Sequence, residues 1–212
     1  MPYFMVRPVV WVLLHIGYWI YGGIRFEGRG HVPRVGGVLI TPNHISDADP
    51  TAIALAAPRA CYFMAKEEIF SMGFLGTLSR WLRGFPVKRN TADRVALHHA
   101  ETLLKQGEAV VMFPEGKISA DGAIQPLFPG ALLIAQHAEA PIVPTIIFGT
   151  DSLLPLGETR PRRPGRKIVV RFGAPITVSE LTGNLKGGAA LKAGAERLHA
   201  MMLALQEPPP RQ

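Results

Sequence analysis

The stretch GGVLITPNHISDADPTAIALAA, residues 36–57, decides the fold class of this 212-residue chain. It begins with an apolar run, GGVLI, that is typical of a short buried strand, and it ends with PTAIALAA, which is typical of a helix and stops at Pro58. Between the two lies TPNHISDADP, which holds a histidine, two aspartates, a serine and two prolines. A polar segment between two buried ones is either a turn with a helix cap or an active site.

The same alternation of strand and helix continues along the chain. Further strands are predicted at 60–65, 85–89, 108–113, 141–149 and 166–173, and further helices at 73–84, 91–107, 130–138 and 191–206. The strands are apolar runs without clean alternation, which predicts a mainly parallel sheet covered by helices on both faces, an α/β domain. Ligands of such sheets bind beyond the carboxyl ends of the strands, where His44, Arg89 and Glu115 are expected. The helix over 91–107 is expected to have its cap at Asn90 or Thr91.

The N-terminal segment VVWVLLHIGYWIYGGI, residues 9–24, is nearly all apolar. Its 16 residues fall short of the about 20 that a straight membrane span needs, and its aromatic residues suit a lipid interface. No small-x-small cleavage site follows it, which disfavours a secretory signal peptide. The segment is either an ordinary buried helix or one that lies in a single leaflet, and the second is favoured. The expected organisation is a membrane-associating segment over 1–24, one domain over 25–206 and a disordered tail over 207–212.

The composition narrows the classes of partner. The chain carries a net charge of +7 and 48% apolar residues. A basic protein binds phosphates, whether on nucleic acid, on an anionic lipid surface or on a phosphorylated substrate. No helix-turn-helix, zinc-finger or RNA-recognition signature is present, so no nucleic acid is expected as a partner. The single cysteine, Cys61, excludes an intramolecular disulfide, and its place in ACYFMA favours a small buried core residue over a nucleophile.

His44 and Asp49 have the chemistry of a general base and its orienting carboxylate. A neutral imidazole takes a hydroxyl proton near pH 7, and a carboxylate on its other ring nitrogen fixes the tautomer and stabilises the imidazolium. Asp49 before Pro50 is equally typical of a helix N-cap, and Asp47 competes as the partner of the histidine. His44 taken alone is also compatible with an ordinary turn.

Two more segments carry candidate site residues. Lys88 and Arg89 precede the helix expected near Thr91, where free N–H groups and two cations would form a phosphate clamp; the alternative is a solvated basic edge. The turn FPEG, residues 113–116, places Glu115 directly after a strand, either as a site residue or as an ordinary turn residue paired with Lys117. No GxSxG elbow, Walker loop or metal-ligand spacing is found, so a direct transfer without a covalent intermediate, a metal or a cofactor is expected.

Four motifs together resemble the lysophosphatidic acid and glycerol-phosphate acyltransferases. They lie in the family's order between about residues 25 and 175: NHISDAD (43–49), a region from KE (66–67) to GFPVKR (84–89), FPEG (113–116) and PIVP (141–144). The resemblance implies a glycerolipid acyltransferase-like fold, with His44 as the base and Asp49 as its partner. It implies a substrate-binding set that comprises Lys66, Lys88, Arg89, Glu115 and Gly116.

The resemblance also implies an activity and a location. The implied reaction moves a fatty acyl group from acyl-CoA or acyl-carrier protein to the free hydroxyl of lysophosphatidate, giving phosphatidate for phospholipid biosynthesis. The enzyme would act at a membrane surface, on the cytoplasmic face of the inner or plasma membrane. The chain departs from the family where Thr-Arg-Ser commonly follows FPEG, since it has Lys117-Ile118-Ser119, and where a lysine is common at Phe128. These changes leave another acceptor open, such as an ornithine-type lysolipid, and a non-catalytic membrane-binding module is the remaining alternative.

Overall fold

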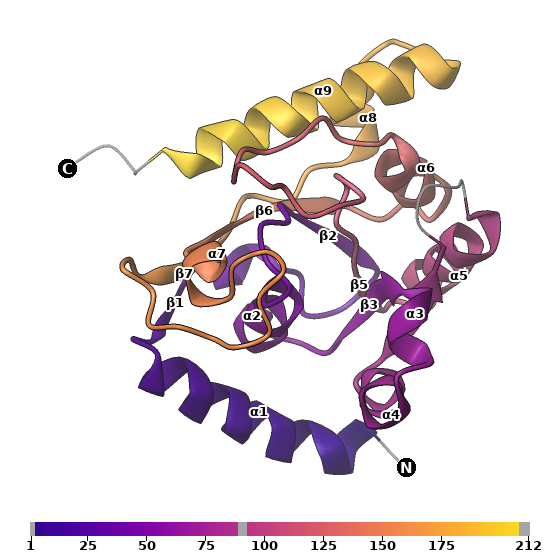
Figure 1. Ribbon diagram of the computed structural model, residues 1–212. Helices are drawn as coiled ribbons and strands as arrows, with labels where there is room; N and C mark the ends of the chain where they lie inside the picture. Colours follow the sequence, from indigo (N-terminus) through magenta and orange to yellow (C-terminus); the bar gives the residue numbers. More distant parts are fainter. Residues whose placement is uncertain (1–2, 89–92, 208–212) are drawn as a thin grey trace.

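The computed structural model describes residues 3–88 and 93–207 of the chain. Strands and helices alternate in these residues, as predicted (Figure 1). In chain order the elements are α1 (Tyr3–Ile20), β1 (Ile24–Glu27), η1 (Arg29–His31), β2 (Val38–Pro42), α2 (Asp49–Ala56), β3 (Cys61–Lys66), α3 (Glu67–Phe70), α4 (Gly73–Trp81), β4 (Gly84–Val87), α5 (Arg94–Lys105), β5 (Ala109–Val111), α6 (Gly130–His137), β6 (Ile142–Phe148), α7 (Thr150–Leu153), β7 (Ile168–Phe172), α8 (Val178–Thr182) and α9 (Gly187–Gln206).

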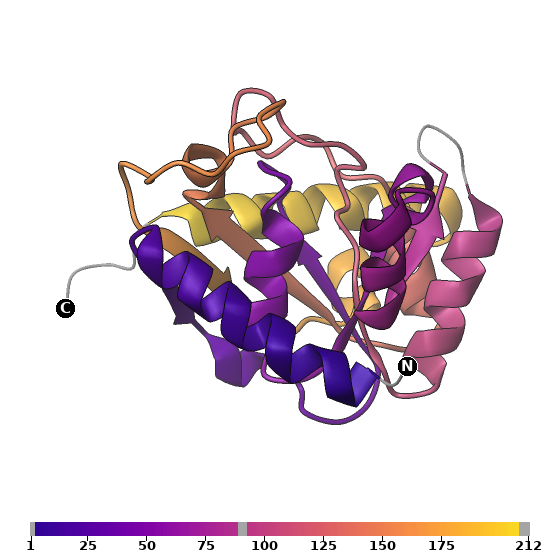
Figure 2. The same ribbon diagram turned by 60° about the horizontal axis from the view of Figure 1, so that its bottom comes forward.

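The strands form one sheet in the order β1-β7-β6-β2-β5-β3-β4. The run from β6 to β4 is parallel throughout. At the other side β7 pairs antiparallel with β6, and β1 pairs parallel with β7. The predicted α/β fold with a mainly parallel sheet is therefore confirmed. Figure 2 shows that the long connections after β5 and β6 project from the same edge of the sheet, which is the edge where the parallel strands end.

Helices cover both faces of the sheet and create two hydrophobic cores. Along β2, Val38 and Ile40 face the core beneath α2, whereas Leu39 faces the core beneath α5, α6 and α9. All three side chains are fully buried. Burial on both faces explains why the strands are apolar runs rather than alternating ones, because each second residue also needs to be apolar. The prediction of a sheet covered on both sides rested on this pattern.

Helix α1 lies on the outer side of α2, opposite α9 (Figure 1). It begins at Tyr3 and ends at Ile20, so it starts earlier and stops earlier than the predicted segment 9–24. Gly22 and Gly23 end it with φ of 109° and 84°, a backbone conformation that glycine adopts without strain, and Ile24 already belongs to β1. The domain boundary drawn at residue 24 thus falls within the first strand. The length and mean hydropathy of α1 suffice to cross a membrane.

The start of α5 corrects one prediction. Asn90 and Thr91, the expected caps, lie outside the described residues, and the N-cap of the helix is Asp93. Its carboxylate accepts the N–H groups of Val95 and Ala96, both at 3.1 Å. A carboxylate at this place neutralises the positive end of the helix dipole. Three capping residues stand close together in the sequence, and the pattern alone selected the wrong one.

Candidate active site

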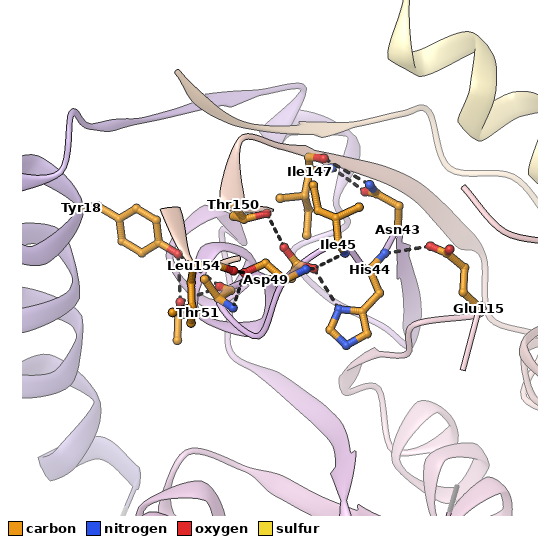
Figure 3. Close-up of polar contacts among 12 residues, drawn as sticks. Tyr18, Asn43, His44, Ile45, Asp49, Thr51, Glu115, Ile147, Thr150 and Leu154 are labelled. Carbon is orange, nitrogen blue, oxygen red and sulfur yellow. Dashed lines mark hydrogen bonds and ion pairs between the residues drawn. The ribbon is translucent and has the colours of Figure 1, made fainter. Parts of the chain in front are cut away.

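The turn that joins β2 to α2 brings His44 and Asp49 together. Asp49 is the first residue of α2, and its Oδ2 lies 2.8 Å from Nδ1 of His44 (Figure 3). Both residues are buried, with 4% of His44 and 0% of Asp49 exposed. The histidine and the carboxylate that were predicted to cooperate are therefore in direct contact.

Asp49 faces the histidine and does not cap its own helix. The N-cap position belongs to Ala48, which makes no side-chain capping bond. The Asp49 carboxylate instead turns back and accepts the backbone N–H groups of Ile45 at 2.7 Å and Ser46 at 2.8 Å. The capping interpretation of Asp49 is thereby excluded by the geometry, since its oxygens accept hydrogen bonds from the turn before the helix.

Asp47, the competing partner, lies on the outside of the same turn. Its side chain is exposed, and among the residues that the structure describes it has no hydrogen bond or ion pair. The choice between the two aspartates follows from the turn, because the Ile45 and Ser46 N–H groups point to the side on which Asp49 lies. Of the two aspartates, Asp49 is the one that contacts the imidazole.

The second nitrogen of the His44 ring is available to a substrate. Because Nδ1 donates to Asp49, Nε2 carries the lone pair that accepts a proton. Within residues 3–88 and 93–207, no side chain or backbone group bonds to Nε2, and it is not among the buried atoms that lack a partner. The ring stacks on Phe113 with centroids 4.1 Å apart and an angle of 25°, so Phe113 covers one face of the imidazole while Asp49 contacts its edge at Nδ1. This is the arrangement that a general base needs.

The FPEG turn holds the backbone of the turn between β2 and α2. The two carboxylate oxygens of Glu115 accept the N–H groups of His44 and Gln125, each at 2.8 Å, and the N–H of Ser119 donates to the carbonyl of His44 at 2.7 Å. Glu115 is 1% exposed, and this burial raises its pKa above the ordinary value of a glutamate, against the opposing effect of the two N–H donors. The contacts of Glu115 are thus made with this chain's own backbone. A contact between Glu115 and a substrate stays a prediction.

Asn43 fixes the turn from the side of β6, a role that the sequence did not indicate. Its side-chain amide donates to the carbonyl of Ile147 at 3.2 Å and accepts the N–H of Ile147 at 2.7 Å. Asn43 thus replaces a pair of ladder hydrogen bonds just beyond the end of β2. Its place as the first residue of the NHISDAD motif was the signal available in the sequence.

The predicted basic residues lie at the same edge of the sheet. Lys66 is the last residue of β3 and is in register with Val87, the last residue of β4, so Lys88 follows at the same level. Lys66 is half-buried and Lys88 is exposed. Since β2, β5, β3 and β4 are neighbours in that order, the residues that follow them, from His44 to Lys88, form a row along the carboxyl edge.

The predicted phosphate clamp changes in one respect. Arg89 lies outside the described residues. The helix start that was expected to offer free N–H groups is filled, because Asp93 accepts those of Val95 and Ala96 and also accepts the N–H of Lys88 at 2.9 Å. These backbone donors, the Lys88 N–H first, hold the pKa of Asp93 below its usual range. A cationic clamp at this edge therefore depends on side chains rather than on the helix N-terminus.

Gly116 is required by the geometry of the FPEG turn. Its φ is 69°, and a Cβ added to it would lie 3.0 Å from the ring of Phe128. Lys117, the proposed partner of Glu115, is exposed and makes no ion pair in the part of the chain that the structure describes. The turn is therefore shaped by glycine and by the backbone contacts of Glu115.

Cys61 takes no part in this edge. It is the first residue of β3, at the opposite end of the strand from Lys66, and it is 4% exposed. Burial raises the pKa of its thiol to about 12, which keeps it protonated and unreactive at neutral pH. The interpretation of Cys61 as a small core residue agrees with its position.

Residues 23–148 match the family model described as acyltransferase. This chain belongs to the acyltransferase family. It is 34% identical over 177 residues to the 1-acyl-sn-glycerol-3-phosphate acyltransferase alpha of Mus musculus, which covers 81% of this chain and 61% of that protein. It is 28% identical over 187 residues to the 1-acyl-sn-glycerol-3-phosphate acyltransferase of Bacillus subtilis (strain 168), covering 88% of this chain and 86% of that protein.

A solved structure has the same fold as this acyltransferase. The crystal structure of the 1-acyl-sn-glycerophosphate (LPA) acyltransferase from Thermotoga maritima aligns with a TM-score of 0.72 and 23% identity, over 97% of this chain and 83% of that one. The chain spans 61% of the length of its mouse relative and 49% of the length of the human protein of the same name. The match to the acyltransferase family includes the segments that follow β2, β3, β4 and β5 at the carboxyl edge of the sheet.

The two aspartates of the turn are predicted to differ sharply when changed to asparagine. Asp49→Asn replaces an acceptor of the His44 Nδ1–H and of two backbone N–H groups by an amide that carries no charge, so we expect a loss of acyl transfer of about 10²–10⁴-fold, the usual range for general-base assistance. Asp47→Asn changes only an exposed side chain and should retain activity within about twofold, because exposed polar groups away from a site contribute little. Steady-state turnover of both purified variants measures this. An equal loss in the two would contradict the assignment of Asp49 as the partner of His44.

Glu115→Gln is predicted to disturb His44 rather than substrate affinity. An amide keeps one acceptor and turns an NH₂ group toward a backbone N–H, so one of the two bridging bonds is lost. We expect kcat to fall on the order of tenfold for every acceptor, as for the loss of one charge-assisted hydrogen bond of about 1.5–3 kcal/mol. Glu158→Gln, at an exposed ion pair with Arg162, is the matched control and should be silent. A selective rise in the acceptor KM with unchanged kcat would instead place Glu115 on the substrate.

Proposed function

We propose that this chain is an O-acyltransferase that moves a fatty acyl group from an acyl thioester to the free hydroxyl of lysophosphatidate, giving phosphatidate. The observation that carries the proposal is the buried contact of 2.8 Å between His44 and Asp49 with Nε2 left open. Its relatives in Mus musculus and Bacillus subtilis, both named 1-acyl-sn-glycerol-3-phosphate acyltransferases, support the choice of substrate.

The chemistry follows from the orientation of the imidazole. Nε2 of His44 takes the proton of the acceptor hydroxyl, and the oxygen forms a bond to the thioester carbonyl carbon. Asp49 stabilises the imidazolium that results. The carbon–sulfur bond then breaks, and the thiolate of the carrier leaves and regains a proton from the imidazolium. Acyl-CoA and acyl-carrier protein both supply such a thioester, and both are proposed donors.

The acceptor phosphate would bind along the basic part of the edge. Lys66 and Lys88 follow the neighbouring strands β3 and β4, and Arg89 comes directly after Lys88. Cations in a row beside the His44 turn would hold a phosphate while the hydroxyl reaches Nε2. Phe128, where the family commonly has a lysine, is 62% exposed beside the FPEG turn and favours a second candidate, an ornithine-type lysolipid or another lipid alcohol.

A panel of acceptors tests the function and separates these candidates. The purified protein is incubated with a radiolabelled long-chain acyl thioester and with lysophosphatidate, lyso-ornithine lipid or lysophosphatidylcholine. Labelled phosphatidate is expected as the main product, and His44→Ala, which keeps the fold, should lose about 10²–10⁴-fold in rate. Product from a neutral lysolipid alone would move the assignment to the second candidate. Wild-type turnover in a folded His44→Ala protein would rule out the mechanism.

We also propose that α1 places the enzyme on a membrane, in one leaflet at the cytoplasmic face. Along α1, Tyr18 is the residue that is buried among those the structure describes, whereas large apolar side chains are exposed at Phe4, Met5, Val9, Trp11, Val12, Leu13, Ile16, Trp19 and Ile20. Such a surface is costly in water and is favoured at the boundary of headgroups and acyl chains. The net charge of +7 adds attraction to anionic lipids of the cytoplasmic leaflet.

Charges placed on α1 are predicted to release the protein from vesicles. In a Phe4→Glu and Trp19→Glu double variant two side chains that are 75% and 78% exposed become anionic, so insertion loses apolar area and gains a desolvation cost. We expect vesicle binding to fall by more than about tenfold, or about 1.4 kcal/mol. Val95→Glu, 80% exposed on α5, is the matched control. Flotation with vesicles at high salt measures the effect, because salt screens adhesion through charge alone. Undiminished flotation of the double variant would show that the membrane anchor lies outside α1.

A further inference from the structure

The corner between β6 and α7 brings a hydroxyl to the far side of the dyad. Thr150, the first residue of α7, is 0% exposed, and its Oγ1 donates to Oδ1 of Asp49 at 2.6 Å (Figure 3). The two residues are 101 positions apart in the sequence. A short hydrogen bond from a neutral hydroxyl to a buried carboxylate is one of the stronger kinds in proteins.

The two oxygens of Asp49 are held differently. Oδ2 accepts three hydrogen bonds, from Nδ1 of His44 and from the N–H groups of Ile45 and Ser46. Oδ1 accepts the hydroxyl of Thr150 and, among the described residues, no other hydrogen bond. Rotation about the Cβ–Cγ bond moves both oxygens, so the donors on Oδ2 oppose it and the Thr150 donor on Oδ1 adds a restraint from the other side of the carboxylate. Together they fix the plane of the carboxylate, and the direction of the bond to His44 depends on that plane.

The surrounding contacts tie the Thr150 corner to the catalytic turn. The preceding residue, Gly149, has φ of 81°, and a Cβ added there would lie 2.8 Å from the carbonyl oxygen of Lys167. After α7, the carbonyl of Leu154 accepts the hydroxyl of Ser46 at 2.7 Å. The corner is thus attached to the turn both at Asp49 and at Ser46, so the Thr150 hydroxyl has little freedom to move away.

We propose that Thr150 is a positioning residue for acyl transfer, which orients the Asp49 carboxylate so that His44 accepts the substrate proton at Nε2. The inference rests on the proposed function. Thr150 does not reach the substrate itself, because it is fully buried behind Asp49. Its contribution therefore belongs to the rate of proton transfer and to the pH at which His44 works, and not to substrate affinity.

Other groups near the dyad define what the pH profile can report. His44 faces Asp49 and, through its backbone N–H, the buried Glu115. Tyr18 lies on the α1 side, and burial raises its pKa to about 12, so it stays neutral in the working range. Asp151, next to Thr150, is paired with Arg166. A shift of the acidic limb near neutral pH on changing Thr150 therefore reports on His44 and its carboxylate.

Thr150→Val removes the hydroxyl and keeps the shape of the side chain. We expect kcat to fall about tenfold, or about 1.4 kcal/mol, while the KM for the acyl thioester stays within twofold. Without this donor the carboxylate is less firmly directed at His44, and Asp49 stabilises the imidazolium less. Since the base works only when neutral, the acidic limb of the kcat/KM profile is expected to move to lower pH. Thr150→Ser, which restores a hydroxyl, should recover both the rate and the profile.

Thr182 offers a matched control. It is buried, with 5% exposed, and its hydroxyl donates to the Val178 carbonyl at 2.9 Å within α8, away from the dyad. Thr182→Val removes the same atoms and should leave kcat and the pH profile unchanged. If Thr150→Val does not fold, Thr150→Cys, which keeps a weaker donor, replaces it in the comparison. Wild-type kcat and profile in folded Thr150→Val, or a loss that Thr150→Ser does not restore, would overturn the proposal.

A measurement without substrate separates this proposal from the proposed function. The Nδ1 proton of His44, assigned by its loss in His44→Ala, is observed by proton NMR in the protein alone. Its resonance is expected to move in Thr150→Val, to return in Thr150→Ser and to stay in place in Thr182→Val. An unmoved resonance in Thr150→Val would overturn the role of Thr150 even if acyl transfer is confirmed. A moved resonance in a protein that transfers no acyl group would contradict only the proposed reaction.

Discussion

The arrangement at the carboxyl edge of the sheet depends on one constraint, which is that a carboxylate buried away from solvent needs hydrogen-bond donors in place of water. Taking an ionised group out of water costs several kcal/mol unless hydrogen bonds replace its hydration. Asp49 is 0% exposed, and its donors come from His44, from the N–H groups of residues 45 and 46, and from Thr150. The turn after β2 and the corner after β6 therefore need to meet at one place. The imidazole of His44 is one of these donors, so its bond to Asp49 also orients the ring.

The parallel sheet makes this meeting possible. Strands that run in one direction end at one edge, and the right-handed crossovers between them return the chain to the opposite edge each time. With β6, β2 and β5 as neighbours, the segments after them supply Thr150, His44 and Glu115 to one small region. Each segment also anchors the backbone of the next: Asn43 bonds to Ile147, and Glu115 bonds to the His44 N–H. The site is stiff because its supports come from three strands.

What the sequence predicts and what it leaves open follow from the range of the interactions. The strands, most helices and the sheet class depend on local periodicity, so these features could be predicted. Asp47 and Asp49 are both close to His44 in the chain, and the family resemblance, not the spacing, selected Asp49. The contact of Thr150 with Asp49 spans 101 residues and that of Glu115 with the His44 backbone spans 71, so both depend on strand order, which periodicity does not encode. The cap of α5 failed for a different reason, because Asn90, Thr91 and Asp93 compete within one turn. Short elements such as β1, α7 and α8 carry too few residues for a period to show.

Helix α1 contacts the start of α2 next to the His44 and Asp49 pair. Tyr18, the buried residue of α1, places its hydroxyl 3.2 Å from the carbonyl of Ala48 and 2.9 Å from the hydroxyl of Thr51. Ala48 directly precedes Asp49, so α1 is attached to the start of α2 next to the residue that orients His44. In the proposed membrane-bound enzyme, α1 would present its exposed apolar side chains to the lipid while it holds the first turn of α2. Because the acceptor and the acyl chain both arrive from a membrane in the proposed reaction, this attachment sets the orientation of the catalytic edge relative to the lipid surface.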